Sequence, residues 1–291
     1  MLIFSTLALL FTLRAQQPAA WLDPDRTAPP GFSYRTFASQ SAKGDVSYLL
    51  YLPPGYEGSQ RRYPVVYWLH GMGGSQRSGT KVVQTMDGLM RNGKAPEMIV
   101  VLVNGMRDSF YVDAADGSMP VESVIVKELV PHVDRTLRTV GSREGRMIEG
   151  FSMGGFGSAR IGFSHPEVFG AVNAMAGAFE GVENIATRRP ELFQRVFLSD
   201  LARVRKATPA AALERNLAAI RGKQRIRVAV GEDDPGLARN RAAHEMLDRL
   251  KIAHEFTVVP GVAHSHAKLY EALGDRACEF HRVAFGGDAG R

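Results

Sequence analysis

The sequence has little cysteine, because Cys278 is the only one in 291 residues. No disulfide can therefore form within the chain, and a chain of this length does not need one to bury a stable core. Cys278 lies in a C-terminal segment with helical periodicity, where we expect a small buried core residue. The sequence shows no clustered His, Cys and Asp spacing typical of a metal site, so neither a metal nor a cofactor is expected.

The sequence also lacks long basic runs, although its formal net charge is +6 and its pI is about 9.5. Lys and Arg are scattered, and pairs such as Arg61-Arg62 and Arg188-Arg189 are short. No basic run alternates with aromatic residues, which excludes nucleic acid as the expected partner.

Beyond the N-terminus, no apolar run is long enough to cross a membrane. Residues 2–13 are nearly all apolar and are followed by Arg-Ala-Gln-Gln, which predicts a signal peptide over residues 1–15. We therefore expect a protein secreted to the periplasm or the exterior, with no stable membrane insertion after the signal is removed. No Lys or Arg precedes the run, and Leu13 is not small, so an uncleaved anchor and a misassigned start are the alternatives.

Short β-rich runs alternate with longer helical runs, which predicts an α/β fold. Strands are expected at residues 46–52, 65–69, 98–103, 146–149, 171–175, 226–230 and 255–259. Helices are expected between them, clearest at residues 123–137 and 238–250. This alternation predicts a mostly parallel central sheet with helices on both faces. The first two strands, which no helix connects, are expected to be antiparallel.

The domain organisation expected is a single catalytic domain over residues 32–291. Residues 16–31 are rich in Pro, Ala and Asp and predict an extended leader. Residues 180–222 form a longer helical and polar stretch between two strands. This stretch predicts an insertion over the strand ends and is a candidate lid.

The strongest motif is Gly-Phe-Ser-Met-Gly-Gly at residues 150–155. A β-like run at 146–149 precedes it and a helix-like run at 156–163 follows it, and this is the setting of a nucleophile elbow in an α/β-hydrolase. The turn lifts the serine hydroxyl above the sheet, near the positive end of a helix dipole. Ser152 is therefore the predicted nucleophile.

An oxyanion hole is predicted from the segment His-Gly-Met-Gly-Gly at residues 70–74, directly after the apolar strand at 65–69. In this fold that loop supplies one backbone N–H, and the residue after the nucleophile supplies the other. Met72 is the predicted first donor, with Gly71 as the alternative, and Met153 is the second. His70 precedes Ser152, so a structural role is expected for it.

The acid and the base should follow the nucleophile in the chain, each in the loop after a late strand. Asp234 is the predicted acid after the strand at 226–230, with Asp233 as the alternative, and either carboxylate could instead cap the next helix. His264 is the predicted base after the strand at 255–259, with His266 as the alternative. A surface or core-filling role is expected for the remaining histidines, which are His132, His165, His244, His254 and His281.

Several further segments carry a family resemblance, at residues 51–56, 69–75, 127–134, 150–157, 165–169 and 261–264. With them the chain resembles the esterase family that contains esterase D, S-formylglutathione hydrolases, feruloyl and acetyl-xylan esterases and bacterial mycolyltransferases. The resemblance implies an α/β-hydrolase three-layer sandwich. The family pattern places the acid three residues after the strand-end glycine, which is Asp234 after Gly231, and the base at His264.

The resemblance and the motifs together predict a secreted serine carboxylic ester hydrolase that works through an acyl-enzyme. The expected substrates are feruloyl or acetyl esters of plant cell-wall polysaccharides. An acyltransferase of the mycolyltransferase type and a general hydrolase of small esters or thioesters are the alternatives. Residues 180–222 lack the aromatic cluster expected of a feruloyl pocket.

Overall fold

The computed structural model describes residues 21–179 and 182–286. The predicted signal peptide, and residues 16–20 of the predicted leader, lie outside the described residues. Residues 21–31 form neither helix nor strand, and Arg77 pairs with Asp23 and Asp25 in this segment. None of the helices within the described ranges is long and apolar enough to cross a membrane.

The centre of the fold is one eight-stranded sheet with the order β1-β2-β4-β3-β5-β6-β7-β8. The strands are β1 Ser33–Ser39, β2 Gly44–Tyr51, β3 Val65–Leu69, β4 Ile99–Val103, β5 Arg146–Phe151, β6 Ala171–Met175, β7 Arg225–Gly231 and β8 Glu255–Val259. The pairs β1/β2 and β2/β4 are antiparallel and the other five pairs are parallel. The mostly parallel sheet predicted from the sequence is confirmed.

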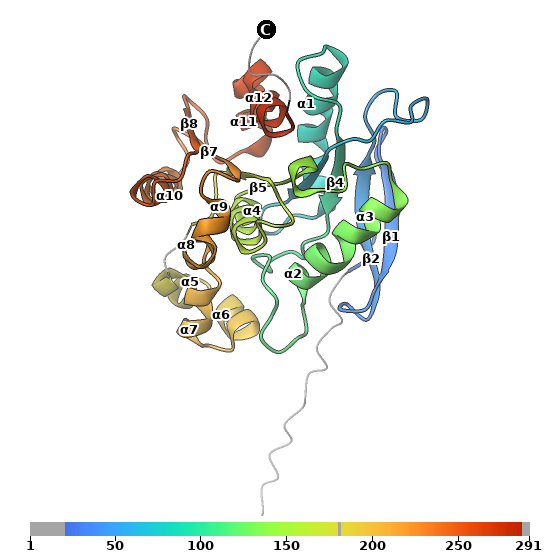
Figure 1. Cartoon of the computed structure of the whole chain (residues 1–291). Helices are drawn as coiled ribbons and strands as arrows, with labels where there is room; N and C mark the ends of the chain where they lie inside the picture. The colour runs from blue at the N-terminus through green and yellow to red at the C-terminus, as the bar shows by residue number, and fades with distance from the viewer. Residues whose placement is uncertain (1–20, 180–181, 287–291) are drawn as a thin grey trace, which may run out of the picture.

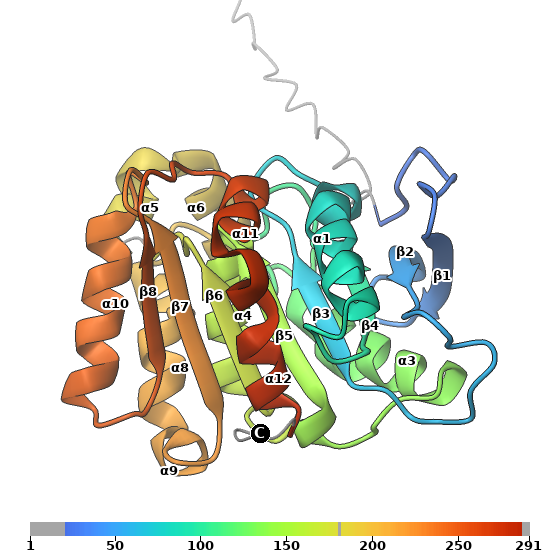
Figure 2. The ribbon, with the colours of Figure 1, turned by 90° about the horizontal axis from the view of Figure 1, so that it is seen from above.

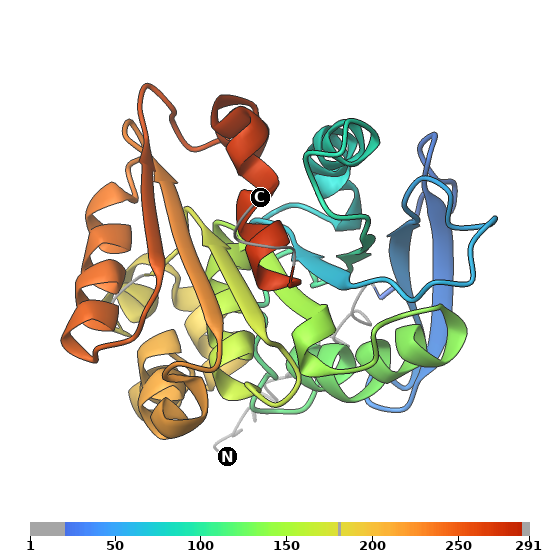
Figure 3. The ribbon, with the colours of Figure 1, turned by 45° about the horizontal axis from the view of Figure 1, so that its top comes forward.

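Helices cover both faces of this sheet (Figures 1 and 2). The helices are α1 Thr80–Arg91, α2 Val121–Ser123, α3 Val130–Thr136, α4 Met153–Ser164, α5 Val182–Arg188, α6 Pro190–Phe197, α7 Leu201–Lys206, α8 Pro209–Arg215, α9 Leu217–Ile220, α10 Leu237–Arg249, α11 His266–Leu273 and α12 Glu279–Ala284. Figure 3 shows α1, α11 and α12 on one face of the sheet and α3, α4 and α8 on the other. The sheet thus separates two apolar clusters, which is the three-layer sandwich of an α/β-hydrolase.

The fold corrects three details of the sequence reading. Strand β1 was missed, because it is an edge strand whose polar residues alternate with few buried ones. Strands β2 and β3 run in opposite directions as expected, but β4 lies between them. The helix expected at 123–137 is interrupted by a π-helical segment at Val124–Leu129. Pro131 follows this segment and has no N–H to continue a regular ladder.

Residues 182–222, the described part of the longer stretch, contain five helices, α5 to α9. Helix α8 packs against α4, so α8 belongs to the helix layer on that face of the sheet and not to a lid. Figure 2 shows α5 and α6 at the end of the sheet where α11 begins, which is the carboxyl end of the parallel strands. Helix α7 packs against both of them.

Candidate active site

Ser152 lies at the sharp turn between β5 and α4, with φ 60° and ψ −115°. A positive φ is strained for any residue but glycine, so surrounding bonds must hold this conformation. The Ser152 N–H donates to the Met175 carbonyl at 2.9 Å, and the Ser152 carbonyl accepts from the Ala178 N–H at 2.9 Å. The end of β6 thus holds the turn on both sides of the serine.

The glycines next to Ser152 are required by close backbone packing. A Cβ at Gly154 would lie 2.0 Å from the Leu69 carbonyl oxygen, and one at Gly155 would lie 2.7 Å from the Met175 oxygen. Both contacts are with backbone, which cannot move aside as a flexible side chain can. The first turn of α4 therefore sits directly against the ends of β3 and β6.

Two further side chains meet Ser152 at the carboxyl end of the sheet. His264, in the loop after β8, places Nε2 2.9 Å from Ser152 Oγ, and its Nδ1 lies 2.6 Å from Asp234 Oδ2. Asp234, in the loop after β7, also accepts the Gly236 N–H on Oδ1 at 2.7 Å. Because a carboxylate only accepts, Nδ1 carries the proton and Nε2 can accept from the serine. This is the hydrogen-bond order of a Ser-His-Asp triad.

Burial differs sharply along this chain of hydrogen bonds. The side chain of Asp234 is 1% exposed, whereas that of His264 is 40% exposed. A buried carboxylate with fixed partners holds the imidazole orientation, while the exposed imidazole can exchange protons with substrate and water. The site is therefore rigid at its acid and open at its base.

The two alternative residues take other positions. Asp233 is exposed, and its N–H donates to the Val262 carbonyl at 3.1 Å. His266 is the first residue of α11, and its ring contacts Trp68 with centroids 5.9 Å apart. Burial lowers the pKa of His266. The structure thus brings Asp234 and His264 to Ser152, and leaves the alternatives outside this hydrogen-bond chain.

The candidate oxyanion loop lies against the serine. A Cβ at Gly71 would be 3.4 Å from the Ser152 Cβ. The Gly73 N–H already donates to the Arg107 carbonyl at 2.6 Å, and the Gly74 N–H donates to the Gly71 carbonyl at 3.1 Å. Of the loop amides, those of Gly71 and Met72 therefore fit the sequence prediction better than those of its last two glycines.

Met153, the second predicted donor, is the first residue of α4. The first N–H groups of a helix have no partner inside the helix, and the helix dipole adds partial positive charge there. The first intrahelical bond is the one from the Phe156 N–H to the Ser152 carbonyl at 3.0 Å. The Met153 amide is thus placed to donate to an anion beside Ser152.

His70 connects the candidate oxyanion loop to the segment after β4 through its two ring nitrogens. Its Nε2 accepts the Gly105 N–H at 3.3 Å, so its Nδ1 carries a proton and donates to the Gly71 carbonyl at 2.8 Å. Burial lowers the pKa of His70 to about 4, so the ring is neutral at neutral pH. The Tyr111 hydroxyl donates to the His70 carbonyl at 3.0 Å. These contacts agree with the structural role expected for His70.

A buried carboxylate–imidazole pair joins β5 to the C-terminal helices, and the sequence does not predict it. Glu149 of β5 accepts hydrogen bonds from the Tyr270 hydroxyl and from His281 Nε2, the latter at 2.7 Å. All three side chains are fully buried. Burial alone would lower the pKa of His281, but the facing Glu149 carboxylate outweighs it and raises the pKa to about 9. Glu149 therefore ties α11, through Tyr270, and α12, through His281, to the strand that leads to Ser152.

The stretch α5 to α6 contacts the rim of the site. Arg189 places Nη1 2.9 Å from the Met72 sulfur, and its guanidinium lies 5.4 Å from the Phe110 ring centroid. Arg195 pairs with Asp108 at 2.7 Å. The insertion therefore touches the loops at residues 70–74 and 105–112 directly.

An apolar cavity of about 330 Å³ lies between α4, α8 and α10. Phe156, Phe179 and Met246 are among its lining residues, whereas Ser152 and His264 are not. This cavity is therefore not the immediate surroundings of the serine.

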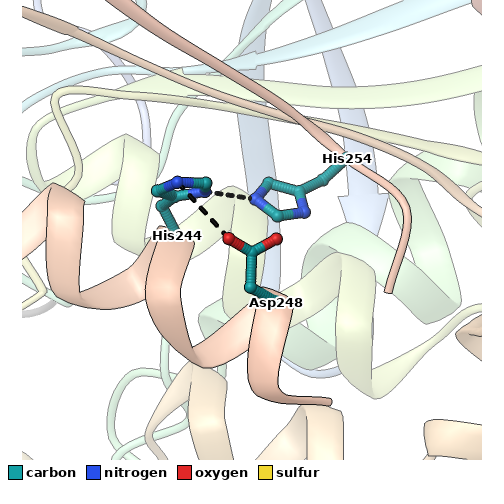
Figure 4. Close-up of side chains that lie close together, drawn as sticks. All are labelled: His244, Asp248 and His254. Atoms are coloured by element: carbon teal, nitrogen blue, oxygen red, sulfur yellow. Dashed lines mark hydrogen bonds and ion pairs between the residues drawn. The ribbon is translucent and has the colours of Figure 1, made fainter. Parts of the chain in front are cut away.

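A group of two histidines and one aspartate is a second feature that the sequence does not predict. His244, Asp248 and His254 each bring a ligand-type atom within 4.8 Å of the others (Figure 4). From the sequence, a surface or core-filling role is expected for His244 and for His254, and no metal-ligand cluster is predicted. The spacing of four and six residues was the available indication, because the first pair shares a helix face.

The sheet topology and the strained serine turn define a hydrolase of the α/β type. A family model described as "Putative esterase" matches residues 39–287, so the chain belongs to this esterase family. This chain is therefore a serine-esterase domain of that family. The family and enzyme class predicted from the sequence are both confirmed.

Known proteins with related sequences carry esterase names. The chain is 31% identical over 172 residues to an "Endo-1,4-beta-xylanase/feruloyl esterase" of Xylanibacter ruminicola, which covers 56% of this chain and 23% of that protein. It is 28% identical over 153 residues to "Esterase Rv1288" of Mycobacterium tuberculosis, which covers 51% of this chain and 32% of that protein. The chain thus matches only about a quarter to a third of the length of these relatives.

Among solved structures, a ferulic acid esterase superimposes with a TM-score of 0.75 and 25% identity. The match covers 88% of this chain and 98% of that one. The shared architecture therefore includes nearly the whole of that enzyme.

Proposed function

We propose that Ser152, His264 and Asp234 form the catalytic triad of this esterase. The observation that carries the proposal is the continuous hydrogen-bond chain from Ser152 Oγ through His264 to the buried Asp234. In the first step, His264 Nε2 takes the serine proton while Oγ attacks the ester carbonyl carbon. Asp234 keeps the imidazole in the productive tautomer and stabilises the imidazolium.

The tetrahedral intermediate places negative charge on the former carbonyl oxygen. The backbone N–H groups of Met72 and Met153 are the proposed donors to this oxygen, each typically worth about 3 kcal/mol in the transition state. Collapse releases the alcohol, to which His264 returns the proton, and leaves an acyl-serine. Water activated by His264 then attacks the acyl carbon and regenerates Ser152.

The proposed substrates are feruloyl or acetyl esters of plant cell-wall polysaccharides. Two findings support this choice, namely the feruloyl esterase names among related proteins and the open site. His264 is 40% exposed and Met72 is 38% exposed, so an ester carried on a bulky polymer can reach the serine. The apolar run at residues 2–13 supports the proposal that the enzyme is secreted after loss of residues 1–15.

The domain organisation is part of the same proposal. Residues 32–291 act as one catalytic domain after a leader at 16–31, and α5 to α7 form a partial cover at the rim of the site. The contact of Arg189 with the Met72 side chain supports this role, because a substrate at the serine must pass beside it.

The test is an ester panel with p-nitrophenyl acetate, p-nitrophenyl butyrate and methyl ferulate, run on the parent protein and on Ser152→Ala. Hydrolysis of methyl ferulate that disappears in Ser152→Ala supports a feruloyl esterase, and hydrolysis of acetate esters alone supports a deacetylase. Ser158→Ala is the control, since Ser158 is fully buried in α4 and bonds to Gly155 and Asn173 carbonyls. Ester turnover that survives in Ser152→Ala refutes the assignment.

An acyltransferase differs from a hydrolase in the second half-reaction, where a sugar hydroxyl group takes the place of water. Adding an acceptor sugar to the same assay yields a new sugar ester if the acyl-serine is transferred to a hydroxyl group. With a hydrolase, the free acid remains the dominant product. A transfer product that exceeds the free acid would replace the hydrolase proposal with the transferase.

A further inference from the structure

Three potential metal ligands converge where α10 borders the chain that leads into β8, outside the hydrogen-bond chain of the serine. His244 and Asp248 lie one turn apart in the second half of this helix, so they project from the same face. His254 comes from the short connection between α10 and β8. Figure 4 shows the three side chains turned toward one another.

The connection after α10 places His254 beside the helix. Lys251 has φ 53°, a left-handed conformation that turns the chain back at the end of α10. The next residue, Ile252, is 3% exposed and donates its N–H to the Leu247 carbonyl at 3.0 Å. The backbone that carries His254 is thus anchored in the core, although its side chain is only half-buried.

The hydrogen bonds of His254 fix which of its nitrogens carries the lone pair. Nδ1 lies 2.8 Å from the Ile252 carbonyl oxygen, which can only accept, so Nδ1 carries the proton. Nε2 therefore has the lone pair and accepts from His244 Nδ1 at 2.7 Å, so a metal ion bound between the two rings would replace the proton on His244 Nδ1. An imidazole whose far N–H is fixed by a carbonyl is the usual arrangement of a metal-binding histidine.

The His244 ring is also held in place. It stacks on Phe256 of β8, with centroids 4.4 Å apart and planes 6° from parallel. Its Nε2 lies 3.5 Å from Asp248 Oδ2. The stacking restricts rotation of the ring, so less conformational entropy is lost when a metal binds.

The distances fit an ion after a small adjustment. Zinc binds imidazole nitrogen and carboxylate oxygen at about 2.1 Å, which separates neighbouring ligand atoms by about 3.4 Å in a tetrahedron. The three ligand atoms here all lie within 4.8 Å of one another. The side chains of His244 and Asp248 are 32% and 61% exposed, so rotation of the carboxylate can close the difference without disturbing the core.

We propose that His244, Asp248 and His254 form a zinc site, with water in the fourth position. Two imidazoles and one carboxylate are a common zinc ligand set, and imidazole favours zinc over calcium or magnesium. The ion joins α10 to the connection that precedes β8. Asp234 precedes α10 and His264 follows β8. A zinc ion that joins α10 to the start of β8 would therefore stabilise the part of the fold that carries both residues.

The experiment uses the full chain, freed of metal with a chelator and then titrated with zinc sulfate in a calorimeter. We expect one zinc ion per chain and a higher midpoint temperature of unfolding in its presence. His254→Gln and Asp248→Asn should each weaken zinc binding at least about tenfold, because even loss of a supporting group costs that much. Both variants should also lose the zinc-dependent rise in melting temperature.

His132→Gln is the matched control, because His132 is a half-buried helical histidine that bonds to Tyr48 at 3.2 Å far from this group. It should bind zinc as the parent does. Equal zinc affinity in the parent, His254→Gln and Asp248→Asn overturns the proposal, as does the absence of stoichiometric binding by the parent. Asp248 is exposed and His254 is half-buried, so the folding of both variants is checked by far-UV circular dichroism in the absence of zinc.

Discussion

Replacing Asp234 with Asn tests the proposed mechanism at its most buried group. The side chain keeps its shape, so Oδ1 can still accept the Gly236 N–H, which lies at 2.7 Å in the parent. The amide NH₂ then faces His264 Nδ1, where the carboxylate lies at 2.6 Å in the parent. A donor in this position forces Nδ1 to accept, and the imidazole proton moves to Nε2.

A proton on Nε2 prevents His264 from accepting the serine proton. Rotating the amide by half a turn would restore the tautomer, but its NH₂ would then face the Gly236 N–H, donor against donor. This substitution lowers kcat about 10⁴-fold in a triad with the same hydrogen-bond arrangement, which corresponds to about 5 kcal/mol in the barrier. We expect a loss of that size here, with little change in KM.

The assay is the initial rate of hydrolysis of p-nitrophenyl acetate over a range of concentrations. Asp233→Asn is the matched control, because it makes the same chemical change at the adjacent exposed carboxylate. We expect the control to keep the parent rate to within about threefold, as a surface substitution does. If Asp234→Asn stays within about tenfold of the parent rate, or if Asp233→Asn shows the larger loss, the assignment of the acid is refuted.

The remaining predictions concern stability. Gly154→Ala should lower the free energy of unfolding by about 1–3 kcal/mol in urea, since its Cβ would lie 2.0 Å from backbone at the end of β3. Gly88→Ala in α1, where a Cβ meets nothing within 4 Å, should raise it by up to about 1 kcal/mol, and equal effects would contradict the packing argument. The pKa of His70, lowered to about 4 by burial, predicts that stability present above pH 6.5 is lost as the pH falls toward 4, by about 3 kcal/mol. Burial lowers the pKa of His281, but Glu149 raises it to about 9, so the stability from that pair is complete below pH 6.5 and is lost as the pH rises through 9. Urea unfolding across this pH range measures both effects, and a flat profile contradicts them.

The sequence alone was sufficient for the features that depend on local pattern. The runs at 65–69 and 171–175 match β3 and β6 residue for residue, and both strands are buried along their whole length. The run at 255–259 also matches β8, an edge strand that is only partly buried. The glycines around Ser152 identified the turn, since only small residues allow its backbone packing. The burial of Cys278 was also predicted and is confirmed.

Tertiary structure decided which of two neighbouring candidates meets the serine. Asp233 and Asp234 are adjacent carboxylates in one loop, and only the backbone path of that loop turns Asp234 toward His264. The same holds for His264 and His266, because the first residue of α11 points toward Trp68. Their catalytic roles stay predictions that the variants above test.

The remaining features arise from contacts between distant parts of the chain, which periodicity does not contain. Glu149 and His281 are 132 residues apart and look like a strand polar residue and a surface histidine, yet they pair in the core. His244 and His254 meet because a left-handed residue reverses the chain after α10. The sequence pattern determined the helices and strands and the type of chemistry. The packing of these elements determined which polar groups are buried side by side, and such groups must pair because an unpaired buried polar group is costly.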